Sequence, residues 1–123
     1  MIGYFILKGE NMNPYDKARD LAKALKESEE FKAYKEAYDK VMTVEDKKEM
    51  VNSYRQKIMN FQIKNMGKDT PDEEELKQLE ALQATLFMDD DIKGFMEKEA
   101  AFARTYAEIM EILEQAIIID GKN

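Results

Sequence analysis

The chain has 123 residues and a mass of 14.4 kDa, which is enough for one small domain with its own core and too little for two. It contains no His, Cys or Trp, so disulfide frameworks, thiolate zinc or iron–sulfur sites and imidazole-based catalysis are excluded. With 19 Lys and Arg against 26 Asp and Glu, the formal net charge is −7, which disfavours direct binding to nucleic acid or an anionic membrane.

Residues 1–12 differ from the rest of the chain because their apolar side chains follow no period. Lys8-Gly9-Glu10 back-translates to a purine-rich tract that resembles a ribosome-binding site ahead of Met12. The interpretation we favour makes Met12 the natural start and residues 1–11 a translated leader, with a docking arm or a short strand as alternatives. No apolar run reaches the length of a membrane span, and the features of a secretory signal are missing.

Two short helices are predicted first. Asn13-Pro14-Tyr15-Asp16 combines an N-cap residue, a first-turn proline and an acid that complements the helix dipole. Apolar residues at helical spacing continue this helix to about Lys26. Ser28-Glu29-Glu30 then predicts a second helix start. The apolar residues that follow it at helical spacing are Phe31, Tyr34, Tyr38, Val41 and Met42.

A long helical hairpin is predicted next. Thr43-Val44-Glu45-Asp46 is a variant capping box, and it opens a helix of about residues 44–66 that Gly67 closes as a left-handed stop. Thr70-Pro71-Asp72-Glu73 opens the following helix, with Thr70 as the expected N-cap. Because only a short linker separates two amphipathic helices, the sequence predicts an antiparallel pair.

The last predicted helix is capped by Asp89-Asp90-Asp91 and runs to about Ile119. The expected fold class is therefore all-α: short N-terminal helices, a long antiparallel α-hairpin and a long C-terminal helix. These elements form one domain over residues 13–119, which a short tail over 120–123 follows.

We expect this helical bundle to form a homodimer, because the apolar stripes are wider than one small bundle can cover. Burying another ~1,000 Å² of apolar surface would contribute on the order of 25 kcal/mol before association costs. Glu99 interrupts the apolar stripe of the last helix, so we expect it to pair with a Lys or an Arg. The candidate oligomer or partner interface consists of Tyr54, Ile58, Phe61, Phe95, Glu99, Phe102, Tyr106, Ile109 and Leu113.

The Asp89–Asp91 cluster has two interpretations. Clustered carboxylates can bind a divalent cation, but the alternating ligands, the glycine and the distal Glu of a calcium loop are missing. The interpretation we favour is a helix N-cap with dipole-complementing acids. We therefore expect no metal and no cofactor, with a metal-dependent or small enzymatic protein using this cluster as an alternative.

In the order of its helix boundaries the chain resembles the bacterial YlbF/YmcA family, and within it the YheA-type branch. The motifs that carry the resemblance are Tyr15-Asp-x-Ala18-x-x-Leu21, Ser28-Glu-Glu-Phe31, Phe61-Gln62 running into Gly67, and the helix from Asp91 through Phe102 to Ala116-Ile117. The resemblance implies a self-associating, all-helical cytoplasmic protein of Gram-positive bacteria. YlbF and YmcA act as non-enzymatic regulatory subunits in ribonuclease Y-dependent RNA processing and in competence, sporulation and biofilm programmes.

One feature separates this chain from those relatives. Members of that complex are linked to cysteine-bound iron–sulfur clusters, whereas this chain has no Cys. The predicted function is a homo-oligomeric adaptor or regulator that contacts an unknown protein partner without direct nucleic-acid or membrane binding. An accessory role in RNA processing is a further alternative.

Overall fold

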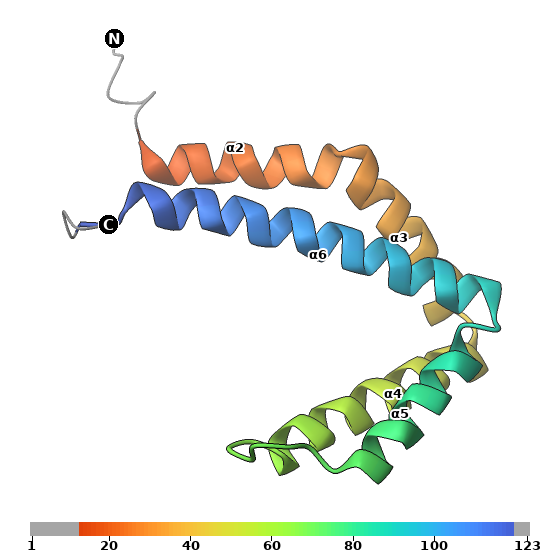
Figure 1. The fold of residues 1–123 in the computed structure, drawn as a ribbon. Helices are drawn as coiled ribbons and strands as arrows, with labels where there is room; N and C mark the ends of the chain where they lie inside the picture. Colours follow the sequence, from red (N-terminus) through yellow and green to blue (C-terminus); the bar gives the residue numbers. More distant parts are fainter. Residues whose placement is uncertain (1–12, 120–123) are drawn as a thin grey trace, which may run out of the picture. The chain divides into compact units, whose positions relative to one another are not determined.

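The computed structural model describes residues 13–119, so the predictions for residues 1–12 and 120–123 lie outside the described part. Within that part the chain forms five helices and no strand, which confirms the all-α prediction. The chain divides into two compact units at residues 33 and 34, and Figure 1 shows the course of each helix.

The first unit contains α2 (Pro14–Glu27) and the first turn of α3 (Glu29–Met42). Asn13 is the N-cap of α2, and its Oδ1 accepts hydrogen bonds from the backbone N–H groups of Tyr15 at 2.8 Å and Asp16 at 3.3 Å. The predicted helix start is thus confirmed.

Ser28 joins these two helices. Its Oγ donates to the carbonyl oxygen of Leu25 at 2.7 Å and accepts from the N–H of Phe31 at 3.1 Å. One hydroxyl therefore bonds a carbonyl group at the end of α2 and an N–H group at the start of α3, two kinds of terminal group that lack a regular partner within their own helix. This pairing explains why the chain can begin a new helix without an intervening loop.

The second unit contains the helical hairpin of α4 (Glu45–Lys64) and α5 (Glu73–Leu86), which lie side by side in opposite directions (Figure 1). Gly67 has φ of 82°, a left-handed conformation that glycine adopts with little strain. Asn65 closes the turn: its amide donates to the Phe61 carbonyl at 2.8 Å, and its Oδ1 accepts from the N–H of Asp72 at 3.0 Å. The predicted hairpin is confirmed.

Two predicted caps of this hairpin are wrong. Val44 is the N-cap of α4 and makes no side-chain cap, because Thr43 Oγ1 instead donates to the Asp39 carbonyl at 2.6 Å and so completes α3. Asp72, rather than Thr70, caps α5 by accepting from two backbone N–H groups.

The final helix, α6 (Asp90–Ala116), is 27 residues long. Asp89 is its N-cap and accepts from the N–H of Ile92 at 3.0 Å, as the sequence predicts. The helix ends at Ala116, so the predicted end at Ile119 is wrong by one turn.

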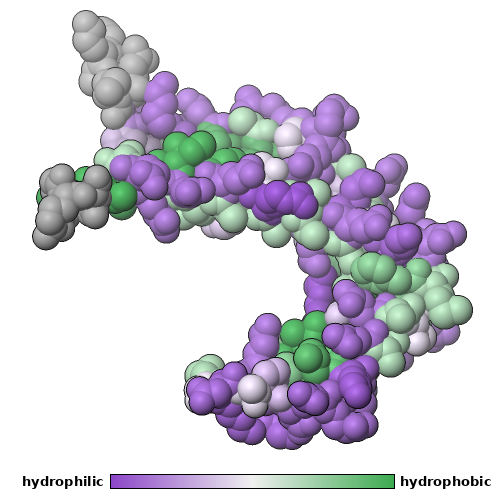
Figure 2. Space-filling view, in the orientation of Figure 1, coloured by the Kyte–Doolittle hydropathy of each residue, from purple (hydrophilic) through white to green (hydrophobic). Residues whose placement is uncertain are grey.

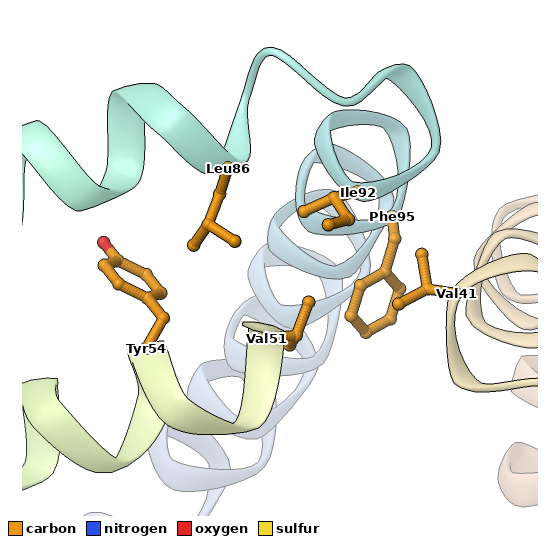
Figure 3. Packing of buried hydrophobic residues seen from close by; sticks show 6 residues of the cluster. All are labelled: Val41, Val51, Tyr54, Leu86, Ile92 and Phe95. Atoms are coloured by element: carbon orange, nitrogen blue, oxygen red, sulfur yellow. The ribbon is translucent and has the colours of Figure 1, made fainter. Parts of the chain in front are cut away.

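The hydrophobic core lies where four helices meet (Figure 3). Its members come from the end of α3, the first half of α4, the end of α5 and the start of α6: Val41, Val51, Tyr54, Leu86, Ile92 and Phe95. Tyr54 is 6% exposed and the others are 0% exposed. No other described residue is fully buried, so the outer halves of the hairpin and of α6 extend beyond the core.

Candidate interaction surface

The predicted interface residues of α6 follow one another at alternating intervals of four and three residues. They are Phe95, Glu99, Phe102, Tyr106, Ile109 and Leu113. This spacing puts them on one face of the helix, in the pattern with which helices pack against other helices. Their exposure rises along α6 from 0% at Phe95 to 53% at Tyr106 and 47% at Leu113. Tyr106 and Leu113 in the outer half of the stripe are therefore accessible, whereas Ile109 between them is half-buried.

The inner half of the stripe is used inside the chain. The Phe95 ring stacks on Tyr34 with centroids 6.0 Å apart, and Phe102 stacks on Tyr34 at 5.7 Å. Tyr38 meets the edge of Phe95 at 5.9 Å. The interface prediction for Phe95 thus needs correction, because its side chain belongs to the core. Periodicity identified the apolar face but not the neighbour that covers it.

Glu99 has its cationic partner inside the same chain. Arg55 of α4 donates to Glu99 Oε1, and Tyr34 of α3 donates to Glu99 Oε2 at 3.5 Å. The Arg55 guanidinium also lies 5.2 Å from the centroid of the Phe95 ring, a cation–π contact. Burial, together with the nearby Glu99 carboxylate, raises the pKa of Tyr34. Glu99 therefore connects three helices beside the core.

The predicted interface residues of α4 lie along its contact with α5. Tyr54 is buried in the core, so it too is a packing residue rather than an exposed contact. Ile58 and Phe61 are half-buried. With Leu76 and Leu79 of α5 they line a hollow of about 250 Å³, which shows that two helices alone do not close this seam.

A second apolar stripe on α4 was not predicted. Met59, Ile63 and Met66 are 52%, 60% and 76% exposed. Their spacing of four and three residues puts them on one side of the helix and its terminal turn. That spacing could have revealed the stripe, but the neighbouring seam of larger residues carries a stronger signal. Figure 2 shows hydrophobic surface on the hairpin and near the end of α6.

The acidic cluster binds a lysine of α4. Lys47 Nζ lies 3.2 Å from Asp89 Oδ2 and 2.8 Å from Asp91 Oδ2. The pKa of Asp89 is lowered chiefly by the hydrogen bond from the Ile92 N–H, and also by Lys47, whose own pKa is raised by hydrogen bonding to Asp91. The cluster is thus a helix cap and an ionic link between α4 and α6. Sequence reasoning found the cap and missed Lys47.

Metal and membrane sites were also sought within residues 13–119. No group of three or more Asp and Glu side chains there is arranged to hold a metal ion. No described helix is both long and apolar enough to cross a membrane.

Comparison with known proteins identifies the family. A family model described as "Control of competence regulator ComK, YlbF/YmcA" matches residues 15–118. The chain belongs to the YlbF/YmcA family. It is also similar to UPF0342 proteins of Staphylococcus aureus strains JH9 and Newman, at 34% identity over 102 residues. Each match covers 83% of this chain and 90% of the relative. No solved structure matches the chain.

The family description gives a regulatory role, and UPF0342 is a family designation without a stated activity. These relatives confirm the predicted family. Together with the geometry, they direct attention to the exposed helix faces rather than to a reaction centre.

Proposed function

We propose that this YlbF/YmcA-family member is a cytoplasmic, non-enzymatic regulator that works as a homodimer through protein–protein contacts. The observation that carries the proposal is the exposure of two apolar residues on the α6 stripe, Tyr106 at 53% and Leu113 at 47%. A stripe of coiled-coil spacing favours a helix as its partner, and Tyr106 and Leu113 in its outer half are exposed. The regulatory description of the family supports the same conclusion.

The electrostatic features of the chain fit this role. Arg55 and Glu99 pair with each other, and Lys47 pairs with Asp89 and Asp91. These charged groups hold helices together, which leaves apolar helix faces as the surface for a partner. Large exposed apolar areas in a folded protein mark interaction sites.

The proposal is tested with the full chain and two substitutions at exposed apolar residues. Tyr106→Asp places a charge on the stripe, whereas Met88→Asp places one at the α5–α6 turn, where the side chain is 83% exposed. Light scattering should give the mass of a dimer for the wild type and for Met88→Asp, and the mass of a monomer for Tyr106→Asp. Circular dichroism should show the same helicity for all three proteins.

Complementation in cells tests the proposed regulatory role. A strain lacking the gene should show altered transcript levels that wild type and Met88→Asp restore and Tyr106→Asp does not. A wild-type chain that stays monomeric at micromolar concentration, or full complementation by a monomeric Tyr106→Asp, contradicts the proposal.

A further inference from the structure

Two exposed segments of the chain carry opposite charge. Every charged residue between positions 50 and 68 is a cation, namely Arg55, Lys57, Lys64 and Lys68. Every charged residue between positions 105 and 119 is an acid, namely Glu108, Glu111 and Glu114. Because Arg55 pairs with Glu99 and Lys64 pairs with Glu75 within the chain, Lys57 and Lys68 carry the positive charge that this part of the chain offers to a partner. Glu108, Glu111 and Glu114 make the outer half of α6 acidic.

Both segments also expose apolar side chains. On α4 these are Met59, Ile63 and Met66. On α6 and the residues that follow it they are Tyr106, Met110, Ile112, Leu113, Ile117, Ile118 and Ile119, with exposures between 37% and 94%. Because both sets stay exposed in the folded chain, neither segment covers the other within one molecule.

The exposed area suits a dimer. Full burial of an Ile- or Leu-sized side chain removes roughly 60–120 Å² of apolar surface from water. The two segments of one copy together therefore offer several hundred Å², close to the ~800 Å² per partner of a standard stable interface. Either segment alone offers less.

The spacing of the apolar residues on the two segments is compatible as well. The exposed apolar residues of α4 are spaced by four and three residues, and so are Tyr106, Ile109 and Leu113 of α6. On a helical projection Glu108 and Glu114 lie on the two sides of the α6 stripe, where they would form the polar rim of an interface. Glu111 lies on the opposite face of the helix and adds to the negative potential of this segment.

We propose that a second copy of this chain covers both segments. In this dimer the outer half of α6 of one protomer packs on the outer half of α4 of the other. A two-fold axis produces two such contacts, because each protomer supplies one acidic and one basic segment. This inference rests on the proposed homodimer and specifies its interface.

Charge reversal tests the pairing in the full chain. Variant A carries Glu108→Lys, Glu111→Lys and Glu114→Lys. Variant B carries Lys57→Glu and Lys68→Glu, and leaves Arg55 and Lys64 in place because they pair with Glu99 and Glu75. Variant A moves the net charge towards zero and adds cations near a helix C-terminus, changes that by themselves favour association and helix formation.

Sedimentation equilibrium at low salt gives the dimer Kd. Each variant alone should dimerise about tenfold or more weakly than the wild type, because like charges then face each other in both contacts. An equimolar mixture of A and B should form a heterodimer with wild-type affinity, because both of its contacts again join opposite charges. Raising the salt concentration should weaken the wild-type dimer.

Other outcomes would overturn the inference in recognisable ways. Weakening by A together with unchanged dimerisation of B would place the outer half of α6 in the interface and exclude the outer half of α4 from it. Variants that dimerise like the wild type would leave the homodimer standing and remove this interface. A monomeric wild type would contradict the proposed function itself.

Apolar substitutions give an independent readout. Ile63→Ser on α4 and Leu113→Ser on α6 should each raise the dimer Kd by about tenfold or more, since each removes apolar area from both symmetric contacts. Met88→Ser is the matched control and should leave Kd unchanged. An effect of Met88→Ser equal to that of the other two would refute the assigned surfaces.

Discussion

Phe95 is the residue at which the fold is most sensitive to truncation. Its side chain is 0% exposed, and its ring contacts Tyr34, Tyr38 and Arg55 from α3 and α4. Phe95→Ala therefore removes the group through which α6 packs against two other helices.

The expected loss follows from three contributions. Truncation of a buried Phe to Ala typically destabilises a protein by about 3–5 kcal/mol. Aromatic pairs add about 0.5–1.5 kcal/mol beyond area burial, and a partly exposed cation–π contact adds about 0.5–1 kcal/mol. Because these contributions overlap, we expect a total loss of about 4–5 kcal/mol, which is a large part of the stability of a small domain.

Urea unfolding followed by circular dichroism measures this loss. Protein concentration must be held equal, because self-association stabilises the native state by mass action. Phe102→Ala is the matched control: Phe102 is half-buried and should lose about half as much or less. A loss below about 2 kcal/mol for Phe95→Ala, or equal losses for the two variants, would refute the reasoning.

Three further predictions concern single residues in turns and caps. Asp89→Asn should lower stability at neutral pH; because the pKa of Asp89 is depressed on folding, its contribution is complete above the ordinary Asp value of 3.8 and is lost as the pH falls through the folded-state value. Unfolding curves of wild type and Asp89→Asn should therefore converge on acidification, and a constant difference down to pH 2 contradicts this. Gly67→Ala, at φ of 82°, should cost about 1 kcal/mol in urea unfolding. Gly94→Ala should stabilise by about 0.5–1 kcal/mol, since nothing lies within 4 Å of the added Cβ; effects of the same sign for the two glycines would contradict both assignments.

Sequence reasoning recovered the helices because their signals are local. Asn13, Ser28 and Asp89 act within a few residues of their own position, and so does the left-handed turn at Gly67. The error at Thr43 arose because its hydroxyl donates to the Asp39 carbonyl of the preceding helix. The error at Thr70 arose because a second capping residue, Asp72, lies two positions further on. Such local alternatives shift a helix boundary by one or two residues.

The interaction surface was only partly predictable, because periodicity identifies an apolar face but not what covers it. Phe95 and Leu113 lie on the same stripe, yet the first is buried and the second is 47% exposed. The partners of Glu99 and Asp89 are separated from them by 44 and 42 residues. Contacts of such separation depend on how the hairpin folds back, and one sequence alone does not specify that.

The position of the core at one meeting point of the helices has a consequence for amide hydrogen exchange. Amides of α6 near Ile92 and Phe95 can exchange only when the core opens, whereas those near Leu113 need only local fraying. Exchange in a dilute monomer should therefore become steadily faster towards the end of α6. If the chains associate through this end, amide exchange there should slow as the protein concentration rises, and the residues that slow would map the contact. Exchange of the core amides would report the stability of the fold itself.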